Sequence, residues 1–74
     1  IYYLYFELNI MRSFLAARKY GVADKSFFEE AFDERIWRIL PYRQILEKMK
    51  SKGKNYSGSF LEQVLNRMDE LCAR

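Results

Sequence analysis

Four carboxylates within six residues are the most concentrated chemical feature of the chain: Glu29, Glu30, Asp33 and Glu34. Residues four apart share one face of a helix, so the set offers two carboxylate pairs to a hard cation. A di-iron site in a helical bundle would also need a Glu-x-x-His element, and the sequence contains no histidine. The alternative is that the helix dipole favours acids in the first turns and that Glu34 pairs with Arg38 one turn later. We favour the alternative and predict neither a metal site nor a cofactor.

The absence of histidine also bears on catalysis. Histidine is the commonest general base, the usual zinc ligand and the partner of most Ser or Cys nucleophiles. The single cysteine, Cys72, has no basic cluster beside it that would activate a thiol, and we predict that it lies in the core. We therefore predict a protein that is not an enzyme.

A basic segment follows the acidic one. Residues 24 to 34 carry five acids and one base, whereas residues 35 to 54 carry seven bases and one acid. The bases that could bind phosphate are Arg43, Lys48, Lys50, Lys52 and Lys54. Spacing by two spreads the lysines around a helix, and Gly53-Lys54-Asn55 lacks the earlier glycine and the Ser or Thr of a P-loop. Solvated lysines are the favoured interpretation, and nucleic-acid binding through this segment is the alternative function.

Aromatic content points to a binding partner. Half of the 74 residues are hydrophobic and thirteen are aromatic, while a domain of this length hides only about 60% of its unfolded surface. Aromatic and Arg side chains are also the residues that interface centres concentrate. We predict a non-catalytic interaction module that docks on another protein or on its own copy, or a subunit of a larger assembly. The predicted contact residues are Tyr2, Tyr3, Tyr5, Trp37, Arg38 and Tyr42. For Trp37, a place at the edge of the core is the alternative.

The opening residues, IYYLYFELNI, admit either a strand or a helix. Alternation and aromatic content suit a strand, but no Gly or Pro interrupts residues 1 to 20, and strands rarely exceed ten residues. Two apolar rows instead follow helical spacing: Ile1, Leu4, Leu8, Met11 and Leu15, and beside them Tyr3, Phe6, Ile10, Phe14 and Ala17. We predict a central helix that packs against neighbours on two sides.

Start and stop signals divide the chain into four helices, near residues 2–20, 26–40, 41–52 and 59–73, in an all-α orthogonal or irregular bundle. Gly21 and Gly53 are placed to end two helices, and Pro41 to break the chain between two more. Ser26 and Ser59 each precede a glutamate by three residues, as in a capping box, and Asp24 is a competing cap for the second helix.

The chain is expected to form a single domain, possibly a fragment of a longer protein. No signal peptide is visible, and one cysteine cannot form an internal disulfide, so we expect a cytoplasmic protein. The longest uncharged run before Glu7 has six residues, which is too short to span a membrane. A span that ends at Phe6 and begins upstream is the alternative. No motif is specific enough to name a family.

Overall fold

The computed structural model describes residues 2–21, 24–53 and 55–73. The elements in chain order are α1 (Tyr2–Lys19), α2 (Lys25–Ile39), the 3₁₀ turn η1 (Leu40–Tyr42), α3 (Arg43–Lys52) and α4 (Gly58–Cys72). The predicted all-α bundle is confirmed, and its opening residues are helical rather than extended.

Local sequence explains where the helices stop. Gly21 and Gly53 have φ angles of 68° and 67°, the left-handed conformation that glycine adopts without steric cost. The Gly53 amide donates to the Met49 carbonyl and so completes the last turn of α3. Pro41 lies in the 3₁₀ turn, so the predicted break after α2 is present, although α3 begins at Arg43 rather than at residue 41.

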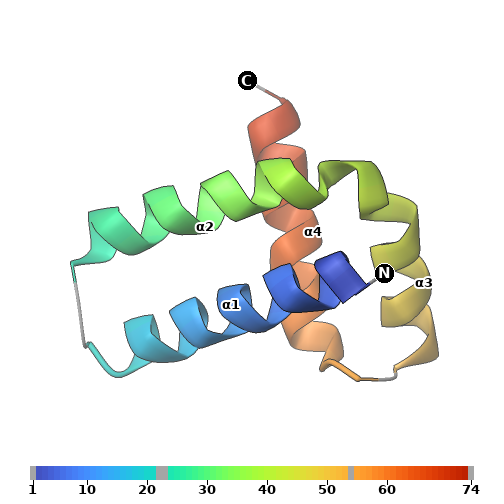
Figure 1. The fold of residues 1–74 in the computed structure, drawn as a ribbon, viewed down its shortest axis with the longest axis horizontal. Coiled ribbons are helices and arrows are strands. Elements are labelled where there is room, and N and C mark those ends of the chain that lie inside the picture. The colour runs from blue at the N-terminus through green and yellow to red at the C-terminus, as the bar shows by residue number, and fades with distance from the viewer. Residues whose placement is uncertain (1, 22–23, 54, 74) are drawn as a thin grey trace.

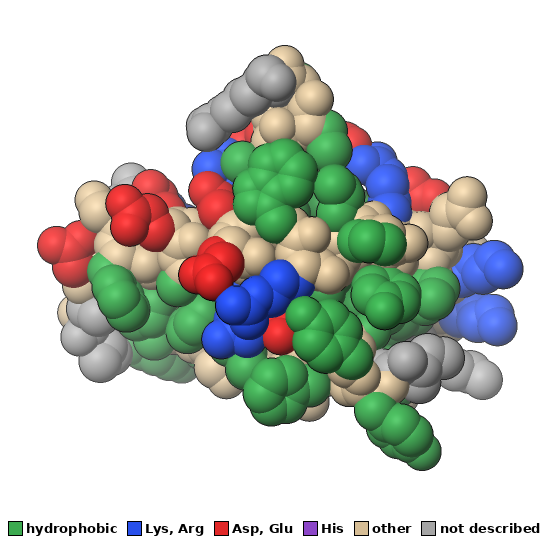
Figure 2. All heavy atoms as spheres, turned by 45° about the horizontal axis from the view of Figure 1, so that its top comes forward, with side chains coloured by type: hydrophobic (Ala, Val, Ile, Leu, Met, Phe, Trp, Pro, Cys, Tyr) green, Lys and Arg blue, Asp and Glu red, His purple; other side chains and the backbone are tan. Residues whose placement is uncertain are grey.

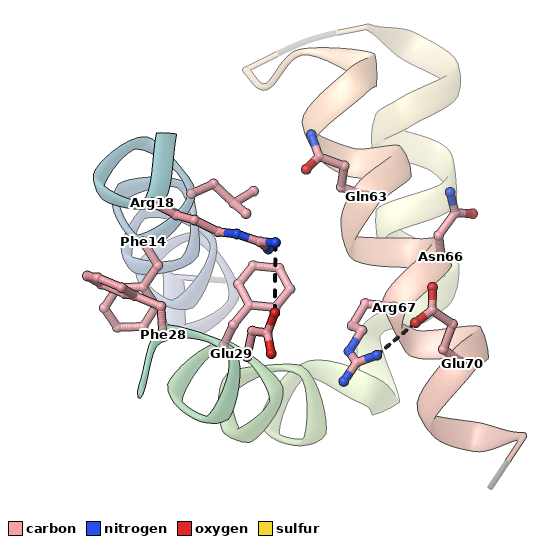
Figure 3. Close-up of a pocket in the computed structure, with 10 residues that line it drawn as sticks. Phe14, Arg18, Phe28, Glu29, Gln63, Asn66, Arg67 and Glu70 are labelled. Carbon is pink, nitrogen blue, oxygen red and sulfur yellow. Dashed lines mark hydrogen bonds and ion pairs between the residues drawn. The ribbon is translucent and has the colours of Figure 1, made fainter. Parts of the chain in front are cut away.

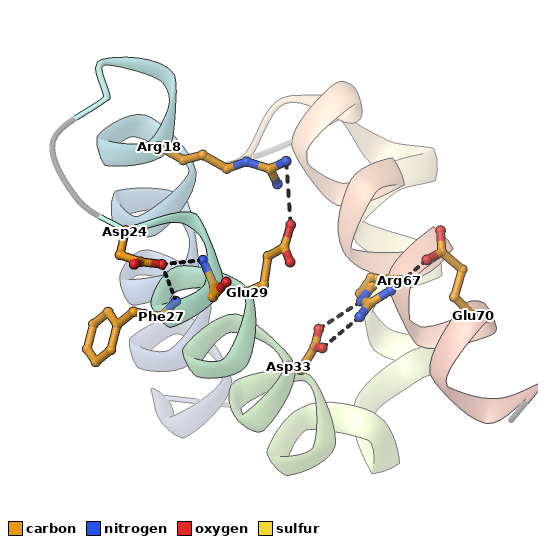
Figure 4. A network of polar contacts seen from close by, with 8 residues as sticks. Arg18, Asp24, Phe27, Glu29, Asp33, Arg67 and Glu70 are labelled. Atoms are coloured by element: carbon orange, nitrogen blue, oxygen red, sulfur yellow. Dashed lines mark hydrogen bonds and ion pairs between the residues drawn. The ribbon is translucent and has the colours of Figure 1, made fainter.

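Both predicted serine caps are wrong by two residues. Asp24 caps α2, because its Oδ1 accepts from the Ser26 amide at 2.7 Å and the Phe27 amide at 3.4 Å (Figure 4). Ser57 caps α4, because its hydroxyl oxygen accepts from the Phe60 amide at 3.1 Å. Ser26 and Ser59 thus lie inside the first turns of their helices.

The helices form two antiparallel pairs that cross. Figure 1 shows α1 and α2 running alongside each other in opposite directions, with α4 crossing behind them at a steep angle. The break at Pro41 turns the chain so that α3 packs along α4 at one end of the first pair. This arrangement leaves the front of the α1–α2 pair uncovered by any other described helix.

The core forms where the pairs cross, and α4 supplies almost half of its buried side chains. Residues from all four helices and from the loop before α4 form one cluster: Leu4, Leu8, Met11, Ile36, Ile39, Leu46, Tyr56, Phe60, Leu61, Val64, Leu65, Met68 and Leu71. Their spacing of three and four places them on one stripe of each helix, as predicted for α4 and for the first row of α1.

Two predictions about the core are wrong. Cys72 is exposed, because it lies one position beyond Leu71 near the end of α4, which projects past α2 (Figure 1). The second row of α1 is only partly packed: Phe6 is 59% exposed and Tyr3 46% exposed. Further along the helix Ile10, Phe14 and Ala17 are half-buried, and the Phe14 ring lies 5.7 Å from that of Phe28, measured between centroids. Helix α1 therefore has one fully buried stripe, and the row beside it reaches solvent at its first two members.

Candidate interaction surface

Large aromatic side chains are exposed on α1 and α2. We call the aromatic face the exposed rings of Tyr2, Tyr3, Phe6 and Trp37, which are 88%, 46%, 59% and 52% exposed. Tyr2 and Phe6 are four apart on α1, so their rings project on the same side. Figure 2 shows the green hydrophobic side chains gathered over this side of the molecule, around a group of charged ones.

An ion cluster joins the two helices beneath the aromatic face. The Glu7 carboxylate is only 1% exposed. Arg35 Nη1 lies 3.0 Å from both Glu7 oxygens, and Arg38 Nη1 lies 3.9 Å from Oε1. Arg38 also donates to Glu34 Oε1 at 2.8 Å, as predicted. A buried carboxylate needs such partners, because removing it from water without them costs several kcal/mol.

This cluster sets parts of α1 and α2 that carry exposed aromatic residues beside each other. The Glu7–Arg38 contact places the turn of α1 that carries Phe6 next to the turn of α2 that carries Trp37. Tyr3 lies 6.5 Å from Tyr42, measured between ring centroids, and continues the contact toward η1. The face is therefore assembled by a pairing between residues about thirty positions apart.

Five of the six predicted contact residues lie on this part of the molecule, and two of them, Tyr3 and Tyr42, contact each other. Tyr2, Tyr3, Trp37, Arg38 and Tyr42 lie along the α1–α2 pair and its end. Tyr5 lies apart from the aromatic face. It is half-buried, and its ring stacks on the Tyr56 ring with the centroids 6.3 Å apart.

Helical spacing predicts Phe6 only in a packed row, whereas its side chain is exposed. Its spacing of four from Tyr2 was the available signal.

The basic residues are not brought into one site. Lys48, Lys50 and Lys52 are exposed on α3, and Lys54 lies outside the described residues. Arg43 is instead paired with Asp69 on α4 and with Glu47, whose Oε1 lies 3.3 Å from Nε. The hydrogen bond with Asp69 is the main cause of a raised pKa of Arg43.

Three of the four acidic residues pair with different arginines: Glu29 with Arg18 of α1, Asp33 with Arg67 of α4, and Glu34 with Arg38 one turn later on α2. Arg18 lies 3.8 Å from Glu29, and Arg67 donates to both oxygens of Asp33 at 2.7 Å (Figure 4). That hydrogen bond is the largest contribution to the raised pKa of Arg67. Within residues 2–21, 24–53 and 55–73, no three Asp, Glu or Cys side chains converge as metal ligands would.

A groove of about 530 Å³ opens on the other side of α2, between the α1–α2 pair and α4. One wall is aromatic, with Phe14 and Phe28 rings 5.7 Å apart, and α4 contributes Gln63 and Asn66 to the other (Figure 3). The ion pairs Arg18–Glu29 and Arg67–Glu70 lie along it. Its charged groups therefore have partners within the chain. Sequence reasoning missed this groove, since its walls come from helices distant in the chain.

A smaller hollow of about 300 Å³ lies beside Tyr56. The Tyr56 hydroxyl donates to Asn9 Oδ1 at 2.9 Å, and the Arg12 guanidinium lies 5.2 Å from the ring centroid. Burial raises the pKa of Tyr56, and this effect outweighs the opposite one of Arg12. Because Tyr56 is itself buried, its ring is not available as a stacking platform.

Among the residues that the structure describes, no helix combines the length and apolar character needed to cross a membrane. Comparison of the chain with protein-family models, with curated proteins and with solved structures gave no match.

Proposed function

We propose that the chain is a non-catalytic helical interaction module that docks on a protein through the aromatic face. The observation that carries the proposal is the exposure of Tyr2, Tyr3, Phe6 and Trp37 in a chain that already has a packed core. Monomeric proteins rarely leave large contiguous apolar patches in water, and such patches mark interaction sites.

The chemistry of the aromatic face supports a protein partner. Aromatic residues and Arg dominate the energetics of protein interfaces, and this face combines rings from α1 and α2 with Arg38. Arg38 already binds Glu34 and Glu7, so a partner that covers it leaves no unpaired charge behind. This lowers the desolvation penalty of forming the complex.

Nucleic-acid binding through Lys48, Lys50, Lys52 and the neighbouring Arg43 has less support. Two carboxylates hold Arg43, and neither of the two hollows described above is lined by Lys48, Lys50 or Lys52. The proposal places the module in the cytoplasm, because one cysteine supplies no internal disulfide of the kind that small secreted domains use.

Site-specific photocrosslinking tests the proposal. A benzophenone amino acid replaces Phe6 in one variant and Glu62, an exposed residue on α4, in a matched control. Each protein is irradiated in purified form and in an extract of the source cells. Covalent adducts of defined mass are expected from position 6 and not from position 62. Failure of position 6 to give any adduct under both conditions would contradict the proposal.

A further inference from the structure

We propose that the hollow beside Tyr56 is a binding site for a phosphate group, which the Arg12 guanidinium holds. The hollow, of about 300 Å³, is lined by Tyr5, Asn9 and Arg12 of α1 and by Asn55 and Tyr56 of the loop before α4. This site goes beyond the proposed function, and it does not depend on the aromatic face.

Arg12 differs from the other arginines of the described chain, because it has no carboxylate partner. Its side chain is exposed, and it donates one hydrogen bond, to Asn9 Oδ1 at 3.4 Å. The other arginines that the structure describes each form an ion pair with Asp or Glu: Arg18, Arg35, Arg38, Arg43 and Arg67. A guanidinium binds an oxyanion through two parallel N–H donors. Arg12 retains this capacity for a ligand.

The Arg12 side chain is held in place at the hollow without a ligand. Its guanidinium carbon lies 5.2 Å from the centroid of the Tyr56 ring, within the range of a cation–π contact. The buried Tyr56 ring is fixed in turn, because its hydroxyl donates to Asn9 Oδ1 at 2.9 Å and its face stacks on Tyr5. A guanidinium that is already ordered loses less conformational entropy when it binds a ligand.

The other polar groups of the hollow favour an anion. Asn9 Oδ1 accepts from both Tyr56 and Arg12, so the side-chain nitrogen of Asn9 is left to donate. Asn55 is exposed and adds a second side-chain amide. Arg12 is the only charged residue among the described residues that line the hollow, which include no Asp or Glu. An anion that binds there therefore meets no repulsion from a lining carboxylate.

The number of donors favours a phosphate over a carboxylate. One guanidinium satisfies both oxygens of a carboxylate, whereas a phosphate ester presents three strong acceptor oxygens. Arg12 and the amides of Asn9 and Asn55 together supply donors for three oxygens. Small-molecule sites begin at about 300 Å³, so the hollow also has room for the organic group of a small phosphomonoester.

Titration followed by amide NMR tests the proposal. The isotope-labelled chain is titrated at neutral pH with inorganic phosphate, glycerol phosphate or acetate, at constant ionic strength so that salt screening does not change. Phosphate is expected to give saturable shifts of the Asn55 and Tyr56 backbone amides and of the Asn9 side-chain amide. Acetate should bind at least about tenfold more weakly, because it lacks the hydrogen bonds to the two asparagine amides.

Two arginine variants isolate the role of Arg12. Arg12→Met is expected to weaken phosphate binding at least about tenfold, because it removes the charged donors. Arg18→Met is the matched control, since it removes the same charge from the same helix at a residue outside the hollow. It should bind phosphate within about twofold of the wild type, because an exposed distant charge is screened. The amide spectrum of each variant shows whether the fold is retained.

Asn55→Gly tests the donor count without altering a charge. Asn55 has a φ of 70°, which glycine adopts freely, so the variant keeps the backbone and loses only the side-chain amide. Phosphate binding should weaken by about threefold or more, whereas acetate binding should not change. Equal effects on the two anions would contradict a phosphate site.

Shifts that do not saturate, equal affinities for acetate and phosphate, or wild-type phosphate binding by Arg12→Met would each overturn the proposal. Glycerol phosphate distinguishes the sources of the phosphate group. Tighter binding than that of inorganic phosphate supports the site with an ester as its ligand, and equal or weaker binding supports it with free phosphate.

Discussion

Arg35 on α2 donates to both carboxylate oxygens of the buried Glu7 on α1, through one guanidinium nitrogen 3.0 Å from each. Arg38 approaches the same carboxylate to 3.9 Å but leaves 44% of its side chain exposed. The contact sets the register of the α1–α2 pair and therefore assembles the aromatic face.

Replacing the two arginines should have unequal effects. Arg35→Met leaves a buried carboxylate with one distant partner and is expected to lower the free energy of unfolding by about 3 kcal/mol. Arg38→Met removes a largely exposed pair and should cost about 0.5 to 1 kcal/mol. Urea denaturation of both variants measures the difference. Equal losses would show that Arg35 does not hold the buried charge.

The cap of α4 gives a second prediction. Ser57→Ala removes the hydroxyl that accepts from the Phe60 amide and should destabilise the chain by about 1 kcal/mol. Ser59→Ala is the matched control, because Ser59 lies within the first turn of α4, and it should change stability by less than about 0.5 kcal/mol. Thermal melts of the two variants distinguish the caps, and a larger loss for Ser59→Ala would place the start of α4 two residues later.

Two glycines separate backbone strain from packing. A methyl group added at either Gly53 or Gly58 meets nothing within 4 Å. Gly53 has a φ of 67°, so Gly53→Ala should cost about 1 to 2 kcal/mol through the left-handed conformation alone. Gly58→Ala, in the first turn of α4, should be neutral or stabilising by up to about 1 kcal/mol. Chemical denaturation is the measurement, and a neutral Gly53→Ala would contradict the assigned end of α3.

Tyr56 makes stability depend on alkaline pH. Burial raises the pKa of Tyr56, so the folded chain keeps this proton at a pH where the unfolded chain has released it. The contribution to stability is complete below about pH 10, the ordinary tyrosine value, and is lost as the pH rises through the raised pKa.

Tyr56→Phe is the control for this pH dependence. The variant loses the hydrogen bond to Asn9, and its free energy of unfolding should fall by about 1 kcal/mol at neutral pH. Its stability should decline less steeply than that of the wild type above about pH 10, the ordinary tyrosine pKa. Urea titrations at several pH values compare the slopes. Parallel slopes for the two proteins would contradict the role of Tyr56.

Much of the fold follows from local sequence. The helical spacing of Leu4, Leu8 and Met11, the glycines that end α1 and α3, and the break at Pro41 are all readable from neighbouring residues. The caps were harder, because Asp24 and Ser26, like Ser57 and Ser59, lie two positions apart, and each could cap a helix that begins at the residue after it. Which of the two residues caps the helix depends on where the chain enters it.

The sequence by itself determined which segments are helical and which stripe of α4 is apolar, because residues three and four apart interact within a single helix. Only the tertiary structure decided that Glu7 meets Arg35, that Tyr5 turns toward Tyr56, and that Phe6 and Trp37 are left exposed. These outcomes depend on how α1 packs along α2 and on how this pair crosses α4, which brings together residues about thirty to fifty positions apart. No local spacing encodes such a crossing, since it is set by how all the apolar stripes pack together at once.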